Sequence, residues 1–208
     1  MSLGSSQWSR ELGATELRPV YLLAGEELLV LEAADALRAR VRELGYVERE
    51  VMDVEASFDW DDLARAAVGM SLFASRRLLD LRLPTGRPGI DGSKALSAYC
   101  DSPAPDTVLL VTCVQWSKKH VGAWSRAIDT VGAMVEFGAP RIDQLPAWIG
   151  ERMALRGLKA TSDAIALLAE RVEGNLLAAA QEIDKLVLLH GEGRLDAATL
   201  ENLVADSA

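Results

Sequence analysis

The sequence has few of the residues from which metal sites and disulfides are built. Only two cysteines and two histidines occur among its 208 residues. Cys100 and Cys113 do not form a Cys-x-x-Cys pair, and neither His120 nor His190 lies at a ligand spacing from them. The sequence therefore predicts no zinc site and no other metal. Neither cysteine has a neighbouring base that would make it a nucleophile, so both are interpreted as small buried hydrophobes.

Long apolar runs are also missing. No window approaches the ~18 uninterrupted apolar residues of a membrane span. The chain does not open with a charged segment followed by an apolar one, as a secretory signal would. Half of the residues are apolar and a quarter are charged, a composition typical of a folded globular protein. The sequence predicts a cytoplasmic protein with no membrane partner.

Positive charge is scarce as well. The chain carries 22 basic and 31 acidic residues, which gives a net charge of −9. Proteins that bind nucleic acid through its phosphates are normally basic. The overall charge therefore argues against a simple nucleic-acid-binding module, although it does not exclude a local basic face.

What the sequence does contain is a regular alternation of strand and helix patterns up to about residue 137. For example, Leu79, Leu81 and Leu83 alternate with polar residues, the period of two that is typical of a strand. Five strands alternating with four helices predict an α/β domain with a parallel sheet covered on both faces. We expect strands at 19–24, 51–54, 79–83, 107–113 and 133–137, and helices at 30–44, 59–68, 93–100 and 118–128.

Charged residues are expected to cover or cap these helices. Arg38, Arg40 and Arg42 lie opposite the apolar stripe of the first helix, so they are predicted to be solvated. Asp59 is predicted to cap the second helix, with Asp61 and Asp62 in its first turn. These three carboxylates could also form an acid/base or metal site, but acidic residues at a helix start more often serve as caps.

The pattern changes after Pro140. No strand is expected beyond this point, and helices are predicted at 143–155, 162–172, 175–189 and 197–204. Gly174 and Asn175 supply a helix stop followed by an N-cap. The sequence therefore predicts an α/β domain at 1–140 and a small helical domain at 141–208, with the opening residues 1–6 as a frayed end.

The turn after the first strand is where a phosphate-binding loop would lie. Such a loop needs the pattern G-x-x-x-x-G-K-[ST], whereas this turn has Gly25 followed by Glu26 and Glu27, with no second glycine and no lysine. The two carboxylates would repel a triphosphate. A second glycine-rich stretch, 86–94, has the wrong spacing and is interpreted as a loop. With no other catalytic motif present, the sequence predicts no cofactor and no enzyme activity.

One connection, between the second helix and the third strand, is unusually apolar. It contains Met70, Leu72 and Phe73, although such connections are normally polar and exposed. The three side chains could fold back into the core. Alternatively, they could form an exposed apolar plug for a pocket on a partner. The residues alone leave both interpretations open.

The segment Met70–Arg76, with the sequence Met-Ser-Leu-Phe-Ala-Ser-Arg, resembles the clamp-binding element of the delta subunit of the bacterial DNA polymerase III clamp loader. The segments Val20–Glu27 and Glu173–Ala178 resemble the same family. The three segments occur in the order of the family and cover both expected domains. The Met-Ser-Leu-Phe element is the more specific of them, and Gly-Asn-Leu-Leu alone is weak.

This resemblance implies a P-loop-NTPase-like domain of the AAA+ or RecA-like type, without a working phosphate loop, followed by a helical lid domain. It implies that Leu72 and Phe73 enter an apolar pocket of the beta sliding clamp, with Met70 beside them, and that the protein opens the clamp during DNA replication. The subunit would be a non-catalytic component of the polymerase holoenzyme, a nucleotidyltransferase complex. ATP would act in sister subunits, and DNA would be contacted only indirectly.

Members of this family continue into a third, collar domain that assembles the five-subunit loader. This sequence stops at Ala208, after the expected lid and without a collar, so we expect clamp binding without assembly into a loader. Two alternatives remain at this point. One is an ATPase with an atypical phosphate loop, and the other is an interaction module with a different partner whose apolar segment belongs to the core.

Overall fold

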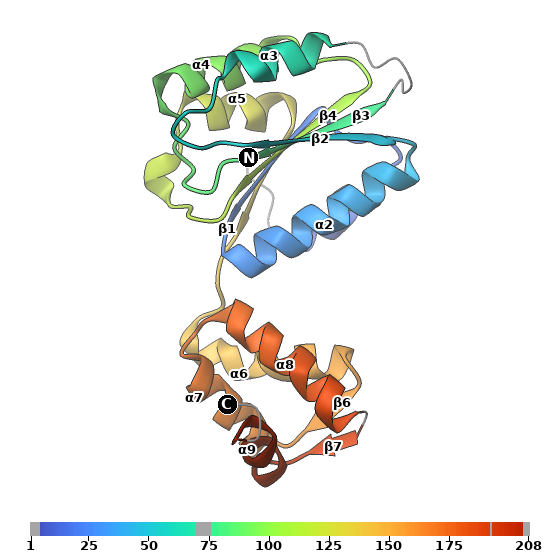
Figure 1. Cartoon of the computed structure of the whole chain (residues 1–208), viewed down its shortest axis with the longest axis vertical. Helices are drawn as coiled ribbons and strands as arrows, with labels where there is room; N and C mark the ends of the chain where they lie inside the picture. Colours follow the sequence, from blue (N-terminus) through green and yellow to red (C-terminus); the bar gives the residue numbers. More distant parts are fainter. Residues whose placement is uncertain (1–4, 70–75, 192, 206–208) are drawn as a thin grey trace. The chain divides into compact units, whose positions relative to one another are not determined.

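The computed structural model of the chain describes residues 5–69, 76–191 and 193–205 (Figure 1). It divides into two compact units, Met1–Gly138 and Ala139–Ala208. Each unit has its own buried residues, and each is described separately below.

The first unit is built on a five-stranded parallel sheet, which confirms the predicted α/β class. The strands are β1 (Val20–Gly25), β2 (Glu48–Asp53), β3 (Arg77–Arg82), β4 (Thr107–Cys113) and β5 (Ala133–Phe137). Their order across the sheet is β2-β3-β4-β1-β5. Strand β1 lies inside the sheet, where Leu22 is paired with Val111 of β4 and Met134 of β5.

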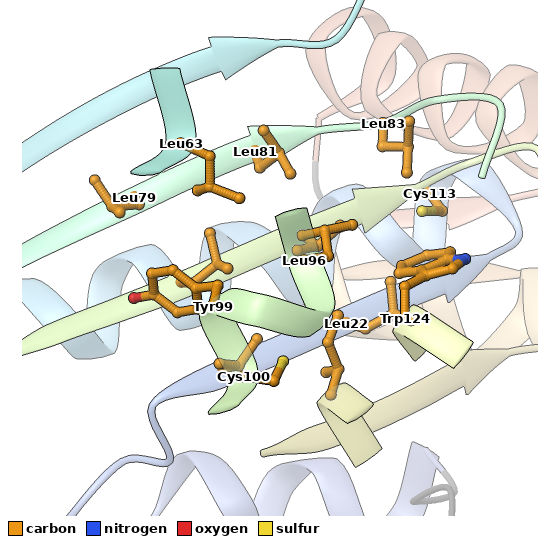
Figure 2. Packing of buried hydrophobic residues seen from close by; sticks show 14 of the residues in the cluster. Leu22, Leu63, Leu79, Leu81, Leu83, Leu96, Tyr99, Cys100, Cys113 and Trp124 are labelled. Carbon is orange, nitrogen blue, oxygen red and sulfur yellow. The ribbon is translucent and has the colours of Figure 1, made fainter. Parts of the chain in front are cut away.

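Helices cover both faces of this sheet (Figure 1). Helices α1 (Ser5–Leu12) and α2 (Glu27–Glu43) pack on one face, and α3 (Asp61–Val68), α4 (Gly89–Asp101) and α5 (Ala123–Val131) pack on the other. Figure 2 shows the second interface, where Leu22, Leu81, Leu96 and Trp124 meet. Successive strand residues point to opposite faces, so Tyr21 joins the α2 side instead. Each buried leucine stabilises the fold by roughly 1.5–3 kcal/mol.

Two features at the helices differ from the sequence-based expectation. Helix α1 begins at Ser5, within the segment that was expected to be a frayed end. It is anchored by Trp8, whose ring lies edge-on to those of Tyr21 and Phe137 at 5.9 and 6.4 Å. The helix expected at 118–128 is divided into a 3₁₀ turn, Lys118–His120, and helix α5.

The second unit is mainly helical. Its helices are α6 (Leu145–Leu155), α7 (Ser162–Val172), α8 (Leu176–His190) and α9 (Ala197–Ala205), with a 3₁₀ turn at Ile142–Gln144. The expectation that no strand follows Pro140 is wrong, because β6 (Leu158–Ala160) and β7 (Gly193–Leu195) form a small parallel pair. Three residues are too few for a period of two to be recognised in the sequence.

Candidate functional site

The turn between β1 and α2 contains a single residue, so there is no room in it for a phosphate-binding loop. Strand β1 ends at Gly25 and α2 begins at Glu27. The Glu26 amide donates a hydrogen bond of 2.8 Å to the carbonyl oxygen of Phe137 in β5. Gly25 has φ +129°, and a Cβ at this position would lie 2.1 Å from the same Phe137 oxygen. The turn is therefore held directly against the neighbouring strand.

The amino-terminal end of α2 is capped by the protein's own carboxylate. The backbone of Glu26 is extended, and its Oε2 accepts a hydrogen bond of 3.0 Å from the Leu29 amide. In a nucleotide-binding protein, the first amides of this helix would face the phosphates. Here a negative charge already interacts with them, and Glu27 adds another in the first turn. The structure thus gives a geometric reason for the missing phosphate loop.

We expect the protein not to bind ATP at this turn. Isothermal titration with MgATP should give no heat of binding at millimolar nucleotide. The Glu26→Gln variant removes one charge but keeps the short turn, so it should still not bind. MgATP binding by the wild-type protein or by Glu26→Gln would support the ATPase alternative if the binding occurs at this turn. A Gly25→Ala variant, which is strained at φ +129°, should then abolish the binding.

The apolar segment with Met70, Leu72 and Phe73 lies outside the described residues, but both of its ends are described. Helix α3 ends at Val68, which is 82% exposed, and the Gly69 amide donates a 2.8 Å hydrogen bond to Arg65 O. On the other side, the buried Arg77 donates from Nη2 to Ala67 O at 3.1 Å. Arg77 lies just after the segment. Its hydrogen bond therefore connects the end of the segment to the last turn of α3, the helix that precedes the segment.

Arg76 provides a second anchor. Its Nη1 donates a 2.9 Å hydrogen bond to Leu44 O, and its guanidinium lies 5.6 Å from the centre of the Tyr46 ring. Because the sheet is parallel, Arg76 and the start of β3 lie at the edge where strands begin, whereas the Gly25 turn lies at the edge where they end. The described residue that follows the apolar segment and the Gly25 turn are therefore on opposite edges of one sheet.

Sequence reasoning missed a buried ion-pair cluster in the same unit. Asp80 in β3 has no exposed surface. It accepts two hydrogen bonds from Arg38 of α2, at 2.9 and 3.2 Å, and two from Arg49 of β2, at 2.9 and 2.6 Å. The expectation that Arg38 is solvated is wrong, because its side chain is only 13% exposed. These hydrogen bonds connect α2 and the edge strand β2 to β3, the strand that follows the apolar segment.

The expectation that Asp59 is the N-cap of the second helix is wrong, because Trp60 occupies the cap position of α3 and makes no side-chain capping bond. Asp59 Oδ1 instead accepts a hydrogen bond of 3.0 Å from the Asp61 amide. Arg65 pairs with both Asp59 and Asp62, and this hydrogen bonding lowers the pKa of Asp59. Within the described ranges, no group of three or more His, Cys, Asp or Glu residues could hold a metal ion.

Both cysteines are buried, in agreement with their interpretation as small hydrophobes. Burial raises the pKa of Cys100 to about 11 and also raises that of Cys113. The thiols are therefore protonated near neutral pH, which makes them poor nucleophiles.

In the part of the chain that the structure describes, no helix is long and apolar enough to cross a membrane.

Comparison with known proteins relates this fold to one family. The profile of the family "DNA polymerase III, delta subunit" matches residues 21–137, more than half of the chain. The chain belongs to this family. The delta subunit of Escherichia coli DNA polymerase III is 33% identical over 194 residues, and that of Haemophilus influenzae is 26% identical over 200 residues. These matches cover 92% and 94% of the chain but only 57% and 58% of the relatives.

Solved structures give the same fold. A Bacillus subtilis DNA clamp loader delta protein superimposes with a TM-score of 0.65 at 23% identity, covering 96% of the chain and 62% of that protein. RuvB of Thermotoga maritima superimposes with a TM-score of 0.61 at 14% identity, covering 97% of the chain and 67% of RuvB. At these identities the likeness concerns the fold alone.

Two of the three segments that suggested the delta-subunit family lie fully within the described residues, and each has a clear structural role. Val20–Glu27 forms β1 and the closed turn described above. Glu173–Ala178 connects α7 to α8, where Glu173 and Gly174 both have positive φ, of 49° and 85°. Asn175 then accepts a 2.9 Å hydrogen bond from the Ala178 amide. The predicted helix stop and N-cap are confirmed, and they explain the Gly-Asn element by backbone geometry.

Proposed function

We propose that this delta-subunit chain binds the sliding clamp of its replicative DNA polymerase and helps to open it during DNA replication. The contact is made by Met70, Leu72 and Phe73, with the two larger side chains in an apolar pocket of the clamp. The observation that carries this proposal is the family match over residues 21–137, which includes this segment. Burial of the leucine and the phenylalanine would each contribute roughly 1.5–3 kcal/mol before entropy costs.

The arrangement of the first unit supports a contact that needs no nucleotide in this chain. The Gly25 turn is closed and its helix end is capped by Glu26. Arg76, which follows the apolar segment, lies at the opposite edge of the sheet. ATP would act in other clamp-loader subunits, which would control access to the segment. The protein itself would then be a non-catalytic component, and the first unit would serve as an AAA+-like scaffold followed by a lid.

The anchored ends of the segment suit a protein that changes the conformation of its partner. A partner shifts a closed ring toward an open one only by binding the open form more tightly. Arg76 and Arg77, at the end of the segment, are hydrogen-bonded to neighbouring parts of the unit. These bonds would hold the segment in place when the clamp pulls on it during opening.

A clamp-release experiment tests this function. The cognate clamp is first placed on a nicked circular DNA, and its dissociation is followed after addition of the protein without ATP. We expect the protein to release the clamp from DNA faster than the clamp dissociates on its own. A variant with both Leu72→Ala and Phe73→Ala should not accelerate this release. If the protein binds the clamp tightly but the clamp dissociates only at its spontaneous rate, the proposal that the protein opens the clamp is wrong and only the proposal that it binds the clamp stands.

A further inference from the structure

Strand β2 forms an open side of the sheet. Among the described strands it pairs only with β3, and the Val54 amide continues this pairing with a 2.9 Å hydrogen bond to Arg82 O. Successive residues of a strand direct their N–H and C=O groups to alternate sides. Counting back from Val54, the backbone groups of Arg49, Val51 and Asp53 therefore face away from β3. No other backbone hydrogen bond between described residues involves them.

A groove of about 640 Å³ runs along this strand, between β2 and α3. Every residue of β2 except Arg49 lines it, together with Phe58 of the following loop and residues of α3. Met52 and Ala66 belong to the buried cluster under α3, and Phe58 packs against that cluster. The groove thus combines apolar side chains with a row of free backbone groups, the two features that bind an added strand.

Two carboxylates of β2 leave the groove with an unbalanced negative charge. Glu48 and Glu50 lie on the same face of the strand, because they are two residues apart, and neither forms an ion pair with another described residue. Two arginines also line the groove, but both are bound elsewhere. Arg65 pairs with aspartates at the start of its own helix, and the buried Arg77 donates to Ala67 O.

The negative charge selects among the possible occupants of this edge. If two copies of β2 paired edge to edge, the glutamates of both strands would lie near one another, and like charges on paired strands destabilise the pairing. A nucleic-acid strand would be repelled by the same carboxylates. An extended protein segment with lysine or arginine side chains would instead be attracted to Glu48 and Glu50.

We propose that this edge binds an extended, basic segment of a partner protein, which joins the sheet as a strand beside β2. The backbone of the segment would pair with the outward N–H and C=O groups of β2. Basic side chains at alternate positions would lie next to Glu48 and Glu50, and an apolar residue between them would lie on the other face, where Val51 is 41% exposed. The contact uses neither Leu72 nor Phe73, so it can be tested without a clamp.

Binding of a fluorescently labelled peptide in which lysine and valine alternate, measured by anisotropy at low salt, tests the proposal. Two further peptides have the same charges but are N-methylated, one at the lysine amides and the other at the valine amides. Only alternate N–H groups of a paired strand face its neighbour. We therefore expect one methylated peptide to bind about 10-fold more weakly or worse and the other to bind like the unmodified peptide.

Variants of the protein locate the contact. Glu48→Gln and Glu50→Gln should each raise the dissociation constant roughly 2- to 5-fold, the effect of an exposed ion pair. Glu170→Gln, at an exposed carboxylate of α7, is the matched control and should leave it unchanged. Val51→Pro removes one outward N–H group and keeps the bonds to β3, so it should weaken binding about 5-fold. If Val51→Pro lowers the melting temperature, the methylated peptides still decide the question with the wild-type protein.

Four results would overturn the proposal. The first is no binding of the unmodified peptide at low salt, and the second is an equal loss of affinity in Glu170→Gln, which would indicate general charge attraction. The third is equal binding of both methylated peptides, which would indicate a contact through side chains alone. The fourth is a concentration-dependent dimer of the protein that Val51→Pro abolishes, which would indicate a second copy of the chain as the occupant of the edge.

Discussion

Truncation of Leu72 or Phe73 to alanine is expected to weaken clamp binding by about 2–4 kcal/mol, the range of interface hot spots. This corresponds to roughly a 30- to 1,000-fold increase in the dissociation constant. The reason is that each side chain would fill an apolar pocket of the clamp and lose that burial when truncated. Titration of the clamp with each variant measures the effect.

A thermal melt of the same variants separates this interpretation from a core position. If the side chains serve binding, the melting temperature should change little, since truncation of an exposed residue leaves no cavity. Ile90→Ala is a suitable control, because Ile90 is an apolar residue of the same unit that is 76% exposed, and it should affect neither quantity. Unchanged clamp affinity, or a large fall in melting temperature, would contradict the plug interpretation.

The second large effect is expected at Asp80. Asp80→Asn keeps the shape of the side chain but removes the charge that Arg38 and Arg49 share. The mostly buried Arg38 is then left with the exposed Asp35 as its ion-pair partner. Breaking a buried ion pair in this way typically costs 3–5 kcal/mol. We therefore expect the free energy of unfolding, measured by urea titration, to fall by about 3–5 kcal/mol.

The exposed pair of Asp53 and Arg82, at 3.4 Å in the same strands, supplies the control. Asp53→Asn should cost less than about 1 kcal/mol, because solvent screens exposed ion pairs. A triple variant that replaces Asp80, Arg38 and Arg49 by leucine or methionine should recover much of the lost stability. Equal, small effects of Asp80→Asn and Asp53→Asn would show that the cluster is not a structural tie.

The regular part of the fold could be predicted because its signals are local. The alternation around Leu79 and Leu81 and the stripe of α2 depend only on neighbours along the chain, and they gave the strands, the helices and the parallel class. The missing lysine and second glycine after Gly25 predict that no nucleotide binds at this turn, and this stays a prediction. The capping bond from Leu29 to Glu26 explains in addition why the turn is closed.

Features that depend on distant parts of the chain could not be predicted. Asp80 follows the polar alternation of a half-exposed strand, yet β3 is covered on both faces, and its two arginine partners lie 42 and 31 residues away. The pair of β6 and β7 is too short to give a period.

Titration of the cognate sliding clamp with the wild-type protein, in the absence of ATP, tests the central claim most directly. We predict saturable binding that is unchanged by added MgATP. We also predict competition by a synthetic peptide of residues 68–77, but not by a peptide in which Leu72 and Phe73 are alanine. Absence of binding, or binding that the wild-type peptide does not displace, would contradict the claim that this segment is the clamp contact.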